Sequence, residues 1–80
     1  MKRSRTSIAD VVIQNIKYWI KDKPINESDS LRDLGFGLYE CVLLTYRLET
    51  EFKIKYSDRM LLNFNTKPIR EIINNISLKL

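Results

Sequence analysis

The first candidate for chemistry in this 80-residue chain is its single cysteine, Cys41. The chain contains no histidine, the residue that activates most serine and cysteine nucleophiles and serves many zinc sites. Cys41 lies in the first turns of a predicted helix, where the helix dipole can lower the pKa of a thiol. It also lies on the apolar stripe of that helix, as buried free cysteines do. The sequence leaves a reactive thiol and a core residue as alternatives, and it favours the core residue.

Carboxylates are the other candidate ligands in the chain. They do not follow the regular spacing of a calcium-binding loop, because they are scattered at Asp22, Glu27, Asp29, Asp33 and Asp58. We expect these residues to cap helices and turns. The sequence therefore predicts no metal site and no enzyme activity.

Charge is concentrated near the start of the chain. The net charge is +4 and the pI about 9.4, and Lys2, Arg3 and Arg5 account for most of the excess. We expect residues 1–6 to form a flexible basic arm and residues 7–80 to form one domain. The arm leaves open a weak nucleic-acid or membrane-surface binder as an alternative function. No apolar run has the length of a membrane span and no signal peptide is recognisable, so a cytoplasmic protein is expected.

Two long amphipathic segments must position these residues. In the first, Ser7 is the expected N-cap, Asp22-Lys23-Pro24 the stop, and the apolar residues recur at helical spacing: Ile8, Val12, Ile16, Trp19 and Ile20. A long loop over residues 22–37 follows, with Ile25 and Leu31 as its apolar anchors.

The second segment is predicted to be a helix from Leu38 to Lys53, with Gly37 as N-cap and Glu40 at the positive end of the helix dipole. One apolar stripe consists of Cys41, Leu44, Leu48 and Phe52. A second stripe, on nearly the opposite side, consists of Tyr39, Leu43 and Tyr46. Arg47 and Glu51 are spaced for an ion pair between the two stripes. A helix with two apolar faces in so small a domain presents one face to the core and leaves the other for a second contact.

The last third of the chain predicts two further helices. Ser57 is expected to cap a short helix over residues 58–62, and Asn63-Phe64-Asn65 to end it. Thr66 is expected to cap the last helix, with Pro68 in its first turn and a frayed tail over residues 77–80. The apolar stripe of this helix is Ile69, Ile72, Ile73 and Ile76.

Two short motifs and their spacing resemble the acyl carrier proteins. Asp33-Leu34-Gly35 precedes the second long helix, and Glu49-Thr50-Glu51-Phe52-Lys53-Ile54-Lys55-Tyr56 ends it. The resemblance covers roughly residues 8–76. It implies an all-α fold, an up-and-down bundle of three longer helices plus one short helix.

The same resemblance points to a missing attachment site. In acyl carrier proteins a serine after Asp-Leu-Gly carries a phosphopantetheine arm, and Leu38 occupies the equivalent position here. We therefore expect no phosphopantetheine. Two other attachment residues stay open as alternatives: Ser30, which stands in the carrier-like triplet Asp29-Ser30-Leu31 but precedes the helix start, and Cys41. Either one would make the protein a genuine acyl or peptidyl carrier.

The favoured interpretation is a non-enzymatic, carrier-like docking or adaptor protein. The resemblance implies a bacterial biosynthetic or peptide-maturation system, with a biosynthetic or modifying enzyme as partner. The expected partner-binding residues are Phe36, Leu38, Tyr39, Leu43 and Tyr46, and self-association through Tyr39, Leu43 and Tyr46 is a further expectation. The alternative is that the long loop folds over this patch and buries it through Ile25, Leu31 or Phe36.

Overall fold

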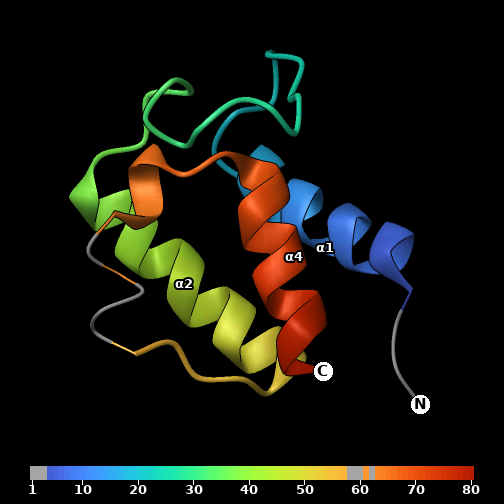
Figure 1. The fold of residues 1–80 in the computed structure, drawn as a ribbon. Helices are drawn as coiled ribbons and strands as arrows, with labels where there is room; N and C mark the ends of the chain where they lie inside the picture. Colours follow the sequence, from blue (N-terminus) through green and yellow to red (C-terminus); the bar gives the residue numbers. More distant parts are fainter. Residues whose placement is uncertain (1–3, 58–60, 62) are drawn as a thin grey trace.

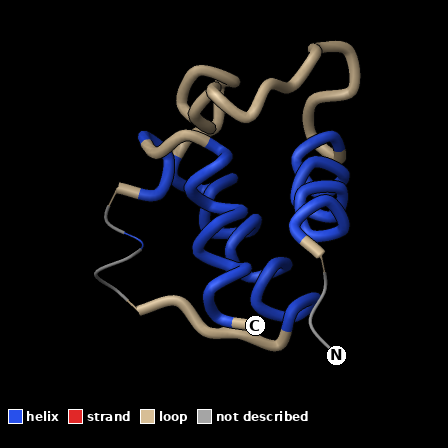
Figure 2. The backbone as a smooth tube through the Cα atoms, turned by 45° about the vertical axis from the view of Figure 1, so that its right-hand side comes forward, coloured by secondary structure: helices blue, strands red, loops and turns tan. Residues whose placement is uncertain are grey.

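The computed structural model describes residues 4–57, 61 and 63–80, and these residues form an all-helical fold. Three α-helices and one short 3-10 helix follow one another (Figure 1): α1 (Arg5–Lys17), α2 (Leu38–Phe52), η1 (Phe64–Thr66) and α4 (Ile69–Lys79). Within the described ranges no strand forms, and the single isolated bridge joins Ser30 to Pro68. The long connection between α1 and α2 lies over one end of the helices (Figure 2). The all-α prediction is confirmed.

Helix α1 begins three residues before the predicted start, because Ser4 and not Ser7 is the N-cap. The Ser4 hydroxyl accepts a hydrogen bond of 3.1 Å from the backbone N–H of Ser7. Arg5, expected in the arm, is therefore the first residue of the helix, whereas residues 1–3 lie outside the described part of the chain. The helix ends at Lys17, earlier than predicted, and the N–H groups of Trp19 and Ile20 still bond to the Ile16 carbonyl.

Helix α2 matches its predicted bounds to within one residue. The N–H of Gly37 donates to the Glu40 carboxylate at 2.8 Å, which is the side-chain half of a capping box. A Cβ at position 37 would lie 3.1 Å from that carboxylate oxygen, so glycine permits the close approach. At the other end, Lys53 closes the helix in the left-handed conformation, with φ at 55°.

The short helix predicted over residues 58–62 falls mostly outside the described residues. The short helical element that is described is η1, a 3-10 turn over Phe64–Thr66 with Phe64 buried, where the sequence predicted a break. The prediction of a fourth helix is matched only in part. Phe64 meets Tyr56 edge to face, with ring centroids 5.5 Å apart, so η1 packs on the link that leaves α2.

Helix α4 starts after Pro68, so the prediction of Thr66 as its cap is wrong. The Thr66 hydroxyl instead donates to the Asn63 carbonyl at 3.0 Å inside η1. The first amides of α4 reach back to the long loop: Ile69 donates to the Asp29 carbonyl at 2.8 Å and Arg70 to the Glu27 carbonyl at 2.9 Å. Loop carbonyls thereby satisfy N–H groups that a helix leaves open at its start. The helix continues to Lys79, so the prediction of a frayed tail is also wrong.

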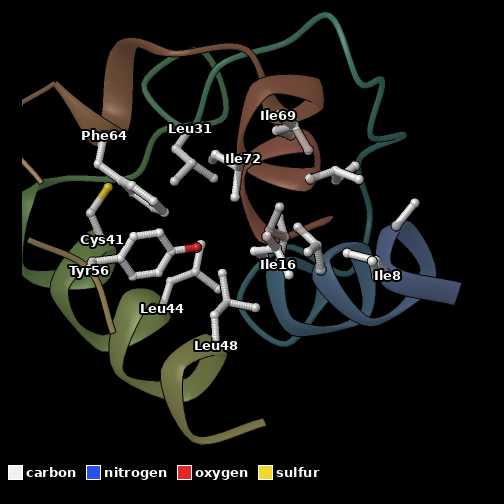
Figure 3. Packing of buried hydrophobic residues seen from close by; sticks show 14 of the residues in the cluster. Ile8, Ile16, Leu31, Cys41, Leu44, Leu48, Tyr56, Phe64, Ile69 and Ile72 are labelled. Atoms are coloured by element: carbon white, nitrogen blue, oxygen red, sulfur yellow. The ribbon is translucent and has the colours of Figure 1, made fainter. Parts of the chain in front are cut away.

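The core lies where the three α-helices and the loop meet (Figure 3). The loop contributes to it directly, because Leu31, Leu34 and Phe36 are buried. Gly35 makes the turn between the last two, with φ at 89°, a value that side-chain-bearing residues resist. The helices contribute buried residues of their predicted stripes: Ile8, Val12 and Ile16 from α1; Cys41, Leu44, Leu48 and Phe52 from α2; Ile69, Ile72, Ile73 and Ile76 from α4. Trp19 and Ile20, predicted in the first stripe, follow the end of α1 and are half-buried.

Candidate functional site

Helix α2 presents a second apolar surface on the side away from the core. Four residues of its first nine form what we call the outer face: Leu38, Tyr39, Val42 and Tyr46. Their side chains are 78%, 72%, 56% and 70% exposed. The four recur at spacings of three, four and seven residues, so they share one side of the helix. Three of the predicted partner-binding residues are therefore brought together at the surface: Leu38, Tyr39 and Tyr46.

Two predicted partner-binding residues lie elsewhere. Phe36 is only 5% exposed and packs edge to face on Trp19, with ring centroids 5.7 Å apart. It belongs to the core, so placing it on the partner surface is a mistake. Leu43 is half-buried at the edge of the outer face. Because the long loop sends Leu31 and Phe36 into the core, it leaves Tyr39 and Tyr46 uncovered.

Val42 is the residue of the outer face that the sequence interpretation missed. On the helix, Val42 lies between the two predicted stripes. The spacing of Leu38, Val42 and Tyr46, four residues apart each time, was the available signal. Val42 also lines a small apolar hollow of about 90 Å³, formed by Leu38, Cys41, Val42, Thr45, Leu61 and Phe64.

None of the candidate attachment residues is an exposed nucleophile. Leu38 is exposed but carries no hydroxyl. Ser30 is 8% exposed, and its hydroxyl accepts a hydrogen bond from the Asp33 N–H while its own N–H donates to the Asp33 carboxylate, both at 3.1 Å. The bond from the Ser30 N–H, followed by the Ser30 side chain, lowers the pKa of the Asp33 carboxyl group. Ser30 thus fixes a turn of the loop.

Cys41 is a core residue with an unreactive environment. Its side chain is 4% exposed and faces Phe64 (Figure 3). Burial, helped by the nearby charge of Glu40, raises the pKa of the thiol to about 11. The thiol is therefore protonated at neutral pH, whereas a cysteine nucleophile must be a thiolate.

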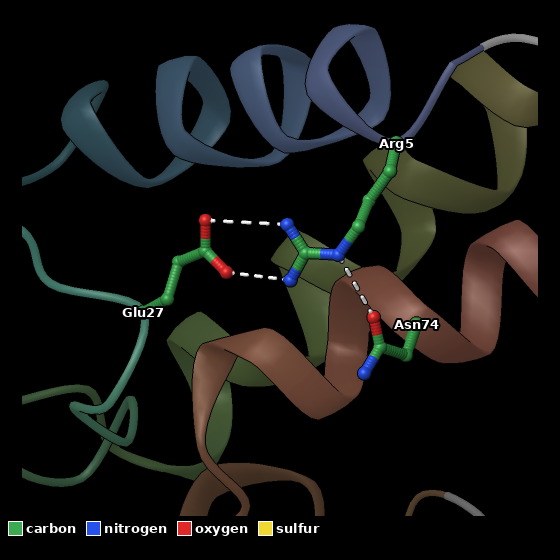
Figure 4. A network of polar contacts seen from close by, with 3 residues as sticks. All are labelled: Arg5, Glu27 and Asn74. Atoms are coloured by element: carbon green, nitrogen blue, oxygen red, sulfur yellow. Dashed lines mark hydrogen bonds and ion pairs between the residues drawn. The ribbon is translucent and has the colours of Figure 1, made fainter.

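Arg5 is fastened to the domain by two other segments (Figure 4). Its guanidinium donates to both carboxylate oxygens of Glu27, at 2.6 and 3.5 Å, and its Nε donates to the Asn74 amide oxygen at 3.1 Å. The hydrogen bonds and the opposite charge raise the pKa of Arg5 and lower that of Glu27. Of the three basic residues assigned to the arm, this one ties α1 to the long loop and to α4.

Metal-ligand groups and membrane-spanning helices were sought in the described ranges. No group of three or more cysteine or carboxylate side chains comes together there as a possible metal site. Among the same residues, no helix combines the length and apolar character needed to cross a bilayer.

Comparisons of the chain with models of known families, with curated proteins and with solved structures found no match. The resemblance to acyl carrier proteins stays a prediction drawn from the motifs themselves. The outer face of α2 is the surface from which a function can be argued.

Proposed function

We propose that this protein is a non-enzymatic docking protein that binds another protein through the outer face of α2. The observation that carries the proposal is the clustering of exposed apolar side chains. Seven large apolar residues are exposed among the described residues, and four of them lie within the first nine residues of one helix. A contiguous apolar patch of this kind is typical of interaction sites. Its two tyrosines also belong to the residue types enriched at binding hot spots.

The outer face is held rigidly, which favours binding. The opposite side of α2 is fixed in the core by Leu44 and Leu48, both fully buried. The first turn, which carries Leu38 and Tyr39, is closed by the bond between Gly37 and Glu40. Little conformational freedom is therefore lost when a partner binds, because the helix is already formed and anchored.

The same geometry supports a role without a covalent arm. Leu38 offers no oxygen for a phosphodiester, the Ser30 hydroxyl is engaged within its turn, and the Cys41 thiol is buried. Incubation with a phosphopantetheinyl transferase and coenzyme A should leave the intact mass unchanged, and a Leu38→Ser variant tests whether the position alone restores loading. A mass gain in the wild type would identify a carrier and overturn this part of the proposal.

A matched pair of substitutions tests the docking surface. Val42→Lys places a charge in the outer face, whereas Leu78→Lys makes the same change on α4, where Leu78 is 84% exposed. Both variants should keep the melting temperature of the wild type within a few degrees. A protein retained from host extract by the wild type and by Leu78→Lys, but lost with Val42→Lys, is the expected partner. Its binding is then measured with purified proteins.

Two results would contradict the proposal. Equal retention of the partner by Val42→Lys and Leu78→Lys would place the binding surface elsewhere. A large fall in melting temperature for Val42→Lys alone would show that the outer face belongs to the fold. Light scattering over a range of concentrations separates a second copy from another protein: a dimer that Val42→Lys dissociates would replace the external partner with self-association.

A further inference from the structure

Arg47 lies beside the outer face of α2 and is held in place before any partner binds. Its Nε donates to the Asn15 amide oxygen at 2.8 Å, and the Asn15 amide nitrogen donates to the Val11 carbonyl, also at 2.8 Å. The guanidinium carbon lies 4.6 Å from the ring centroid of Tyr18 and 5.8 Å from that of Trp19. These contacts orient a side chain that would otherwise lose rotamer freedom on binding.

No residue that the structure describes accepts a hydrogen bond from the terminal nitrogens of Arg47. The predicted pair between Arg47 and Glu51 is replaced by the bond to Asn15, and Arg47 forms no ion pair with any residue that the structure describes. Arg47 is itself exposed. A planar guanidinium with free N–H groups matches the two oxygens of a carboxylate.

Two shallow hollows border Arg47, and the first of them also reaches the outer face. One, of about 440 Å³, is lined by Asn15, Tyr46, Arg47, Thr50 and Glu51. The other, of about 350 Å³, is lined by Gln14, Asn15, Lys17, Tyr18 and Arg47. Because Tyr46 belongs to the outer face and also borders the first hollow, a segment bound on the outer face can reach Arg47 directly.

Basic groups slightly outnumber acidic groups around this side of α2. Lys17 stands next to Arg47, and a further hollow beyond Tyr46 is bordered by Lys53 and Lys55. Three acidic residues lie among them, and the carboxylate of the first, Glu40, accepts the Gly37 N–H at 2.8 Å. The Glu49 carboxylate accepts the Tyr56 N–H at 2.8 Å and so is engaged within the chain, while Glu51 borders the hollow beside Arg47. Four basic groups stand against three acidic groups, two of which are hydrogen-bonded to backbone N–H groups of the chain, and this balance favours an acidic ligand.

We propose that the partner of the outer face is an acidic amphipathic segment, which packs its apolar residues on Tyr39, Val42 and Tyr46 and places a carboxylate on Arg47. This inference rests on the proposed function and adds the chemistry of the partner. The basic residues beside the outer face disfavour a second copy of the chain, because its own basic residues would repel them.

The test uses two amphipathic helical peptides of about 18 residues with identical leucine positions. One carries glutamate on its polar face and the other glutamine. Binding to the full chain is followed by NMR, through the backbone amides of the outer face and the Nε–H signal of Arg47. At low salt the glutamate peptide should bind about tenfold more tightly, and its addition should shift the Arg47 Nε–H signal.

Arg47→Gln and the control Arg70→Gln remove the same charge from exposed positions. Arg47→Gln should reduce the preference for the glutamate peptide to within about twofold, whereas Arg70→Gln should retain most of it. Arg47→Lys keeps the charge but loses the planar pair of N–H donors, so it should retain only part of the preference for the glutamate peptide. Dispersed spectra of each variant establish that it is folded.

The outcomes separate the two proposals. If both peptides shift the outer-face amides equally, the docking surface stands and the acidic preference is wrong. If Arg47→Gln and Arg70→Gln lose the preference equally, the attraction is general and Arg47 has no special role. If neither peptide shifts the amides of Tyr39, Val42 and Tyr46 at about 1 mM, both the acidic preference and the docking surface fall.

Discussion

The two sides of α2 differ in burial and in what they contribute to the fold. On the inner side, Leu44 and Leu48 are fully buried against the other elements of the core. On the outer side, Tyr39 and Tyr46 are more than two-thirds exposed. The inner residues are needed to form the domain, because they remove apolar area from water. The outer residues remove little, so the fold does not account for their apolar character, whereas the docking role that we propose would.

The largest effect on stability is expected from a substitution on the inner side of α2. Leu48→Ala should lower the free energy of unfolding by about 2–5 kcal/mol, because a fully buried leucine leaves a cavity. Leu38→Ala, on the outer side, should change it by no more than about 0.5 kcal/mol. Urea unfolding of both variants, followed by circular dichroism, gives the two values. Similar losses would erase the distinction between the two sides.

A second test uses the thiol on the inner side. The pKa of Cys41 is raised from an ordinary 9.0 to about 11, so at a pH of about 8 the thiolate fraction is about 100-fold lower than in the unfolded chain. Labelling of the native protein by a thiol reagent should be slower by at least that factor than labelling in denaturant. It should accelerate about tenfold per pH unit up to the pKa. Equal rates in native and denatured protein would show that the inner side opens to solvent.

A smaller effect concerns the polar group that the core encloses. The hydroxyl of Tyr56 points into the core (Figure 3) and has no hydrogen-bond partner among the described residues. Burial, with a contribution from the charge of Glu49, raises its pKa. Tyr56→Phe should therefore raise the free energy of unfolding by about 1 kcal/mol, since a buried unsatisfied group is removed. Tyr46→Phe, on the outer side, should have no measurable effect. A loss of stability in Tyr56→Phe would indicate that the hydroxyl is bonded.

The smallest effect comes from a surface contact outside both sides of α2. The pKa of Glu27 is lowered from 4.5 by its hydrogen bonds and charge interaction with Arg5. The stabilisation by this pair is present above that ordinary pKa and is lost as the pH falls through the lower pKa of the folded state. Glu27→Gln should flatten the fall in melting temperature over this acidic range, and added salt should weaken the difference. An unchanged acid profile would mean that the pair does not persist in solution.

Local pattern was enough to predict the inner side and the start of α2. The stripe from Cys41 to Phe52 follows helical periodicity, and the cap at Gly37 needs only Glu40, three residues away. The start of α1 was misplaced because Ser4 and Ser7 are both suitable caps, and sequence alone does not rank them. The start of α4 was missed for another reason: its amides bond to carbonyls some forty residues earlier, which no local pattern contains.

The site was less predictable than the fold for the same reason. Tyr39 and Tyr46 could be found from helical spacing. Phe36 was assigned to the surface because it adjoins the helix start, but its burial depends on Trp19, which lies in a distant part of the chain. Arg47 was expected to pair with Glu51 one turn away, and instead it bonds to Asn15, 32 residues away. Contacts between different elements determine both the burial of Phe36 and the partner of Arg47.

The loop carbonyls that receive the first amides of α4 also have a kinetic consequence. Ile69 and Arg70 donate to Asp29 and Glu27, so the start of α4 can close only after the chain has brought two distant segments together. Closing so long a segment costs chain entropy. We therefore expect this junction to form late in folding. In the native protein, hydrogen exchange at these two amides reports detachment of the loop and not fraying of the helix. Glu27→Gln, which removes the charge that pairs with Arg5, should accelerate exchange there before it accelerates exchange in α2.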